Sequence, residues 1–223
     1  MKFSVRSLVN IVLVVFAWVV WLWVADQEFS KAVNLSIILA GILVIFPVVW
    51  LGRLVLDKQP TLERASWMTT FVQYGLGIPL GMALIRAVIT HGDWSGWTLP
   101  IPAEIGLVLS IITGAATLLC VANLALKGLG APFAIALSKK LASDWLYAWS
   151  RNPMMFAGLA FLVSLGLWYR SALFVLWALL LVSPALLFFL KVYEERELEV
   201  RFGASYLEYR SRTPFLFPRK PKA

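Results

Sequence analysis

Two short polar clusters interrupt the apolar C-terminal half of this chain. The first reads Arg151-Asn152-Pro153-Met154, and the second begins with the adjacent acids Glu194 and Glu195. A guanidinium group and the amides at a helix start bind anionic groups. A carboxylate can remove a proton from an amine or thiol acceptor. The first cluster could therefore meet an anionic group, and the acids of the second could accept a proton.

The first cluster has the pattern of a helix start. Pro153 occupies the first helical position, which proline favours, and Asn152 precedes it as the expected N-cap. The amides of this helix start could meet an anionic group. The alternative is that Arg151 extends toward lipid phosphate and Asn152 only caps the helix.

The second cluster has helical spacing. Two faces are expected, one with Glu195, Leu198 and Phe202 and the other with Glu194, Glu197 and Arg201. Glu197 and Arg201 have the favourable i, i+4 order. Gly203 can end this helix, and a short amphipathic helix with Tyr206 and Tyr209 can follow. A helix lying on the membrane surface is the alternative, but it does not explain paired acids at membrane depth, which usually have a partner or a function.

The composition indicates that lipid surrounds much of the chain. It is 61% hydrophobic and 14% charged, with a mean hydropathy of +0.81, whereas soluble domains are about a quarter charged. The net charge of +8 fits basic residues beside a membrane, so we predict no nucleic-acid partner. The single cysteine, Cys120, excludes an intramolecular disulfide, and no metal site is expected.

Six apolar runs of residues are expected to form transmembrane helices. They are residues 7–25, 32–56, 67–89, 105–126, 154–168 and 172–190. Pro47 predicts a kink in the second and Pro184 an interruption in the sixth, while Tyr169 to Ser171 predict a tight hairpin before the sixth. The first run is too long for a signal peptide and lacks a clear cleavage site. The expected fold is all-α: a polytopic membrane bundle of about six helices with a short cytoplasmic helical tail.

Basic residues set the predicted orientation. If both termini are cytoplasmic, all of the 20 lysines and arginines except Lys31, Arg86 and Arg170 fall on inner segments. We therefore expect an integral protein of the bacterial inner (cytoplasmic) membrane with both ends inside.

The motifs resemble those of a known enzyme family. The pattern comprises Gly128 to Phe133, Lys140-Leu141, Tyr147, Arg151-Asn152-Pro153-Met154, Glu194-Glu195, Leu198, Phe202-Gly203, Tyr206, Tyr209, Pro214 and Pro218. Over roughly residues 100–218, it resembles the isoprenylcysteine carboxyl methyltransferase family. It also resembles the wider group that includes the phospholipid N-methyltransferases. The expected division is thus residues 1–100, transmembrane helices of unassigned role, and residues 101–223, a methyltransferase-like core with its tail.

The resemblance implies a membrane enzyme that uses S-adenosylmethionine, with a cytoplasm-facing pocket and a lipophilic acceptor that enters from the bilayer. By position, the implied catalytic residues are Glu195, Glu194 and Arg151. The implied cofactor-binding residues are Tyr147, Arg151, Asn152, Pro153, Met154, Glu194, Tyr206 and Tyr209. In the carboxyl methyltransferases an arginine lies one turn before the second acid, and Lys191 takes that place here. The resemblance leaves the acceptor and the oligomeric state open.

Two other classes of membrane protein are alternatives. A membrane reductase that uses NADPH, of the sterol-reductase type, would share a related C-terminal architecture but resembles this chain less at the paired glutamates and Phe202-Gly203. A non-catalytic transporter or scaffold is disfavoured because the spans carry few charges at their centres. The sequence therefore favours methyl transfer to an isoprenylcysteine-like carboxylate, a lipid headgroup or another membrane-soluble molecule.

Overall fold

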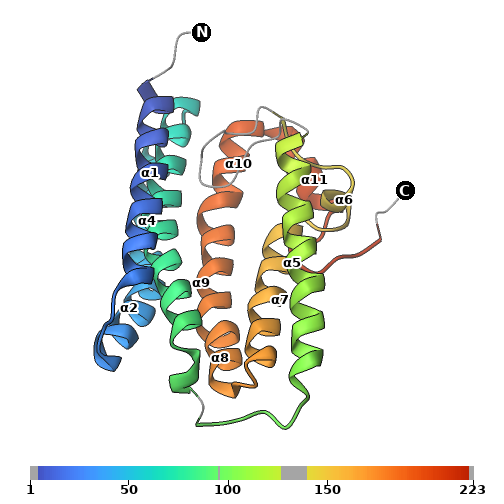
Figure 1. Cartoon of the computed structure of the whole chain (residues 1–223). Helices are drawn as coiled ribbons and strands as arrows, with labels where there is room; N and C mark the ends of the chain where they lie inside the picture. Colours follow the sequence, from blue (N-terminus) through green and yellow to red (C-terminus); the bar gives the residue numbers. More distant parts are fainter. Residues whose placement is uncertain (1–4, 95, 127–139, 221–223) are drawn as a thin grey trace. The chain divides into compact units, whose positions relative to one another are not determined.

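The apolar runs fold as helices, which satisfy their own backbone hydrogen bonds in lipid. The structure is a computed structural model, and it describes residues 5–94, 96–126 and 140–220 (Figure 1). Among these residues, five helices are long and apolar enough to cross a membrane, and Pro153–Trp168 is a shorter apolar helix. These six account for the predicted spans, so the all-α membrane bundle is confirmed.

The chain packs as two compact units, which are described separately. In the described residues, the first unit comprises 5–92 and 184–201, and the second comprises 93–94, 96–126, 140–183 and 202–220. The last long helix therefore contributes to both units. The functional division expected near residue 100 stays a prediction.

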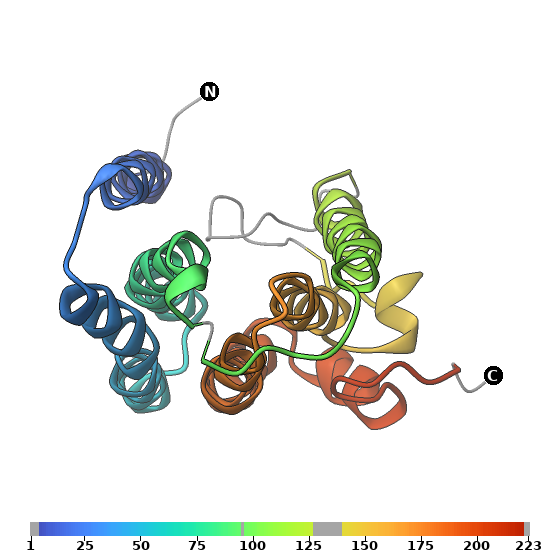
Figure 2. The ribbon, with the colours of Figure 1, turned by 60° about the horizontal axis from the view of Figure 1, so that its bottom comes forward.

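Helix α4 (Leu62–Ile89) is the centre of the first unit. Helices α1 (Val5–Asp26), α2 (Lys31–Leu43) and α3 (Ile45–Lys58) all pack against it (Figure 2). Between α1 and α4 the packing includes hydrogen bonds, because the Tyr74 hydroxyl donates to the Asn10 carbonyl at 3.1 Å. This unit is completed by η3 (Phe189–Glu194), a π-helical turn that packs against α3.

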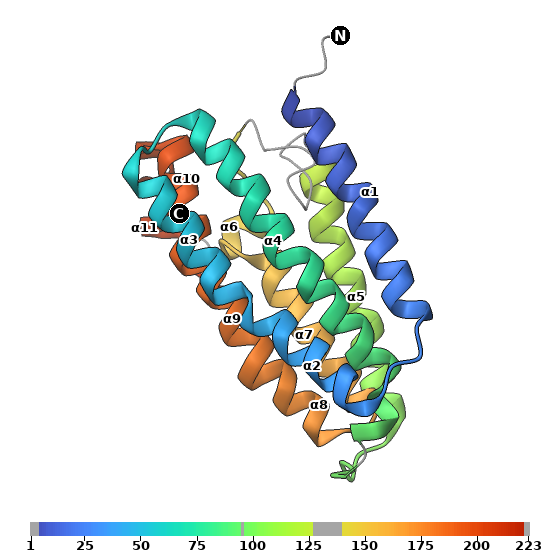
Figure 3. The same cartoon turned by 90° about the vertical axis from the view of Figure 1, so that its left-hand side faces the viewer.

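The irregularity predicted at Pro47 is a one-residue interruption at Val44, where the backbone stays in the right-handed helical region. Helix α2 ends at Leu43 and α3 begins at Ile45, and the two follow one another along α4 (Figure 3). A proline ring clashes with the carbonyl four residues earlier, which here belongs to Leu43. The interruption therefore lies where the proline requires it.

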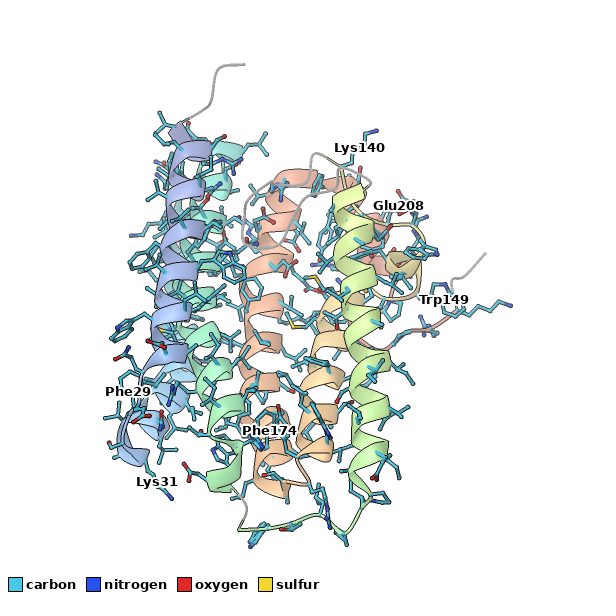
Figure 4. All side chains as sticks on the ribbon, viewed as in Figure 1. Phe29, Lys31, Lys140, Trp149, Phe174 and Glu208 are labelled. Atoms are coloured by element: carbon cyan, nitrogen blue, oxygen red, sulfur yellow. The ribbon has the colours of Figure 1, made fainter. Side chains whose placement is uncertain are left out.

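A buried arginine fixes the connection between α1 and α2. The Arg86 side chain, only 3% exposed, donates to Asn34 Oδ1 at 2.7 Å and to the carbonyls of Val24 and Gln27, both at 2.9 Å. Its guanidinium also lies 5.1 Å from the ring centroid of Phe29, which Figure 4 labels. A buried cation is tolerated when hydrogen bonds satisfy it, and these bonds join α4 to the C-terminal end of α1.

Helices α5 (Ala103–Leu126) and α7 (Pro153–Trp168) form an antiparallel pair in the second unit. Gly106 permits their close approach, because a Cβ at that position would overlap the backbone of Trp168. Further along, Gly114 faces the ring of Phe161. Two pairs, Gly106 with Trp168 and Gly114 with Phe161, thus define the register of the two helices.

The hairpin predicted after α7 is present. Arg170 has a φ of 54°, and the Ser171 hydroxyl caps α8 (Ala172–Trp177) by accepting from the Phe174 amide at 3.2 Å. Left-handed backbone at one residue allows the sharp reversal. Helix α8 then packs back against α7.

The last long helix runs from Ala172 to Phe202 with two π-helical turns, η2 (Ala178–Val182) and η3, around α9 (Ser183–Phe188). The interruption predicted at Pro184 is the π turn η2 just before it, not a break. After η3, α10 (Glu195–Phe202) ends at Gly203, whose φ is 53°. Helix α11 (Ala204–Arg212) follows, so the predicted two-helix end is confirmed.

Candidate functional site

The Arg-Asn-Pro segment lies between α6 (Leu146–Trp149) and α7 in the second unit. Pro153 is the first residue of α7 and Asn152 occupies the N-cap position, as predicted. The Asn152 side chain does not cap the helix, however; its amide donates to the Phe215 carbonyl at 2.8 Å. The expected side-chain cap is therefore wrong, and the first amides of α7 are left without it.

A segment that we call the tail, Thr213–Arg219, holds this turn through backbone hydrogen bonds. The Arg151 amide donates to the Pro214 carbonyl at 2.9 Å, and the Arg219 amide donates to the Trp149 carbonyl at 3.0 Å. The fully buried Ser150 hydroxyl donates to the Leu216 carbonyl at 2.8 Å. Sequence reasoning missed Ser150, because a serine beside a cap has no distinctive local pattern.

Three predicted tyrosines support the same turn. Tyr147, Tyr206 and Tyr209 are all buried. The Tyr209 hydroxyl donates to the Tyr147 carbonyl at 2.7 Å, and Arg151 Nη1 donates to the Tyr206 hydroxyl at 3.4 Å. Burial raises the pKa of Tyr209 above its ordinary value, so its hydroxyl keeps the proton that it donates. These contacts favour a positioning role for Tyr206 and Tyr209.

The predicted residues of the second unit are thus brought together at one end of α7. Met154 lies in the first turn of this helix and is half-buried. The Arg151 guanidinium lies 5.5 Å from the ring centroid of Phe215. Trp149, labelled in Figure 4, is 47% exposed. A cationic side chain, helix-start amides and an exposed indole ring are therefore close in sequence and anchored by one tail.

The paired acids lie in the first unit, at the junction of η3 and α10. Glu194 ends the π-helical turn, and Glu195 begins α10. Lys191 Nζ donates to Glu195 Oε2 at 3.1 Å, so the basic residue one turn earlier does pair with the second acid. The Glu195 side chain is only 12% exposed.

A third acid, Glu197, is buried near the pair. It is 3% exposed, and its Oε1 accepts from Arg201 Nη1 at 2.7 Å, which confirms the predicted i, i+4 pair. The same oxygen accepts from the Thr69 hydroxyl at 3.2 Å. Thr69 was missed because it lies 128 residues away in the sequence, and no local pattern connects the two.

Arg151 and Asn152 belong to the second unit, whereas Glu194 and Glu195 belong to the first. A common pocket for the two clusters therefore stays a prediction, as do the assigned catalytic and cofactor-binding roles. The predicted motif from Gly128 to Phe133 lies outside the described residues.

A buried amide on α5 was also missed. Asn123 is 5% exposed, and its Nδ2 has no hydrogen-bond partner in the part of the chain that the structure describes. Gly114 of α5 faces Phe161 of α7. Asn123 lies nine residues after Gly114, and Asn152 lies nine residues before Phe161. The antiparallel register therefore brings Asn123 level with the start of α7. The signal in the sequence is an asparagine in an otherwise apolar run.

One of the comparisons with known proteins gave a match. Residues 103–205 match a family model described as phospholipid methyltransferase. Searches of curated proteins and of solved structures gave no match. The matched segment begins at the first residue of α5 and contains Tyr147, the Arg-Asn-Pro turn and the paired acids. The resemblance predicted from the sequence is thus confirmed for this segment, and it implies an integral membrane methyltransferase.

Proposed function

We propose that this protein, a membrane methyltransferase by the family match of residues 103–205, transfers the methyl group of S-adenosylmethionine to a lipophilic acceptor. The acceptor would be an isoprenylcysteine-like carboxylate, a lipid headgroup or another membrane-soluble molecule. The reaction would take place on the cytoplasmic side of a bacterial inner membrane. The observation that carries the proposal is the Arg-Asn-Pro turn at the start of α7, which lies within the matched segment. The tail and the buried tyrosines anchor this turn.

The groups at this turn fit the cofactor. Its amino-acid end carries a carboxylate, for which Arg151 and the first amides of α7 are suitable partners. A buried amide without a partner is costly in an apolar setting, and Asn123 Nδ2 would gain one from a ligand acceptor. The exposed ring of Trp149 can face a cation, an attraction of about 0.5–2 kcal/mol.

The protein's contribution would be mainly orientation. The sulfonium of the bound cofactor supplies an activated methyl group. The chain then has to hold the acceptor atom in line with it, an effect of the kind that anchored side chains provide. A carboxylate acceptor needs no base, whereas for an amine or thiol Glu195 would accept the proton. Lys191, bonded to Glu195, would help to orient that carboxylate.

Calorimetry tests the cofactor directly. The purified full-length protein in lipid nanodiscs is titrated with S-adenosylmethionine, with its demethylated product and, separately, with NADPH. We expect binding of the first two and none of NADPH. Absence of binding at millimolar S-adenosylmethionine contradicts the proposal, and tight binding of NADPH alone would support the reductase class.

Variants and lipid extracts test the reaction. Arg151→Ala should abolish cofactor binding, whereas Arg212→Ala, which removes only an exposed ion pair with Glu208, should not. Glu195→Gln should abolish transfer to an amine or thiol, with the exposed Glu208→Gln as its control. Incubation of lipid extracts with methyl-labelled cofactor identifies the acceptor from the labelled product. Full transfer by Glu195→Gln would remove Glu195 from the mechanism.

A further inference from the structure

We propose that helices α3 and α4, which precede the family match, position the acid pair Glu194–Glu195, and that Thr69 and Asp57 are the positioning residues. This inference rests on the proposed function, in which the acid pair lines the reaction site. The groups involved all belong to the first unit.

The first connection passes through Thr69 of α4. Its hydroxyl lies 3.2 Å from the Tyr193 hydroxyl and 3.2 Å from Glu197 Oε1. Tyr193 directly precedes the acid pair, and Glu197 follows it by two residues. The exposed fractions of Thr69, Tyr193 and Glu197 are 4%, 1% and 3%, so water does not compete for these bonds. The Thr69 hydroxyl, which also donates to the Ala65 carbonyl of its own helix at 2.8 Å, therefore contacts the last helix on both sides of the acids.

The second connection passes through α3. Arg53 Nη1 donates to the Val192 carbonyl at 2.9 Å, and Arg196 Nε donates to Asp57 Oδ1 at 2.8 Å. Arg53 and Asp57 also pair with each other, one turn apart on α3. Val192 precedes the acid pair by two residues, and Arg196 follows it directly. Arg53 and Asp57 thus contact the last helix at two positions four residues apart, on either side of the acid pair. Thr69 does the same one residue further along the helix.

The backbone at the acid pair explains why two such connections are useful. The π-helical turn η3 ends at Glu194, and the α-helix resumes at Glu195. A π turn inserts an extra residue into the helix, and single π turns occur frequently at functional sites. Each residue in an α-helix rotates the side-chain direction by about 100°. Loss of the π turn would therefore rotate Glu194 and Glu195 away from the helix faces that they now occupy. The hydrogen bonds at Val192 and Tyr193 oppose that loss.

Packing alone would not require these groups to be polar. The same helix also contacts α3 through Phe46 and Phe188, whose ring centroids are 5.1 Å apart. Apolar residues of similar volume commonly stabilise as well as a buried polar network does. Hydrogen bonds restrain direction as well as distance. The polar contacts around the acids are therefore better suited to orienting Glu194 and Glu195 than to holding the helices together. Gly52 contributes to this packing, because a Cβ there would overlap the Val72 side chain of α4 and would also crowd the Tyr193 ring.

The kinetic test uses three variants of the full-length protein. Thr69→Val removes the hydroxyl at nearly constant volume, Thr69→Ser retains it, and Phe46→Leu is a packing control on the same interface. We expect Thr69→Val to lower kcat by about 10–100-fold with cofactor affinity within about twofold of wild type. Thr69→Ser should restore kcat, and Phe46→Leu should leave it unchanged. Full activity in Thr69→Val, or a loss that Thr69→Ser shares, overturns the inference.

A second measurement does not depend on methyl transfer. Cys120 is the only cysteine, so Glu194→Cys and Glu195→Cys can each be labelled by a thiol reagent in a Cys120→Ser background. The ratio of the two labelling rates reports which face each position occupies. We expect Thr69→Val to change this ratio and Thr69→Ser to preserve it; an unchanged ratio in Thr69→Val overturns the inference. If the wild-type protein binds no S-adenosylmethionine, the proposed function fails while this ratio still decides the positioning role.

Discussion

Replacement of Tyr209 by phenylalanine would remove one hydrogen bond and little else. The hydroxyl donates to the Tyr147 carbonyl at 2.7 Å, and Tyr209 is 3% exposed, so no water replaces the lost donor easily. The ring remains and still packs against Tyr206, with the centroids 6.4 Å apart. Loss of a buried hydrogen bond that leaves its acceptor unpaired costs about 1–2 kcal/mol. We therefore expect α11 and the tail to open about 5–30 times more often.

Hydrogen–deuterium exchange measures this opening. The amides of Arg219 and Thr213, which bond to Trp149 and Tyr209 carbonyls, should lose protection by that factor in Tyr209→Phe. Tyr206→Phe is the control, since it removes the longer 3.4 Å contact with Arg151 and should change protection less. Equal protection in wild type and Tyr209→Phe, or a larger loss in Tyr206→Phe, would refute the supporting role given to Tyr209.

Three further outcomes follow from particular contacts. Asn123→Leu should lower affinity for S-adenosylmethionine about tenfold or more without lowering the melting temperature, because the buried amide has no partner among the described residues to lose. Calorimetry measures the affinity and thermal melting measures the stability, and intact affinity would exclude Asn123 from the site. Gly106→Val should lower the melting temperature sharply because its Cβ would overlap the Trp168 backbone, whereas Gly158→Ala, with open space around it, should not. Because burial raises the pKa of Tyr209, its contribution to tail protection should be present below pH 10 and decline as the pH rises above that value, and exchange in Tyr209→Phe should lack this decline.

The sequence predicts the membrane helices well because each depends on local properties. Apolar runs, Pro47, Pro153 and Gly203 mark helix limits through their own backbone chemistry, and the observed limits lie close to them. Pro184 shows where such reasoning becomes ambiguous. A proline inside a helix can break, bend or widen it, and here the widened turn η2 precedes the proline while the helix continues.

The site is less predictable because its contacts are long-range or involve the backbone. In the tail, the backbone carbonyls of Pro214, Phe215 and Leu216 accept these hydrogen bonds. Because every residue has a backbone carbonyl, no side-chain pattern in the sequence predicts them. Asn152 illustrates the consequence: the residue type fits a cap, but a tail carbonyl takes its amide. Thr69 and Asp57 likewise depend on partners 128 and 139 residues away. By contrast, the i, i+4 pair of Glu197 and Arg201 was visible from local spacing.

The long sequence separation between the polar groups of α3 and α4 and their partners on the last helix has a consequence for biosynthesis. Asp57 and Thr69 emerge from the ribosome well over a hundred residues before Arg196 and Glu197, a delay of about 6–25 s at ordinary elongation rates. During that interval, the newly inserted N-terminal helices must wait in the bilayer with these polar groups unmatched by their final partners. Truncation before residue 190 should therefore yield a nascent chain that membrane quality-control proteases recognise, even though all of its N-terminal helices have already been made.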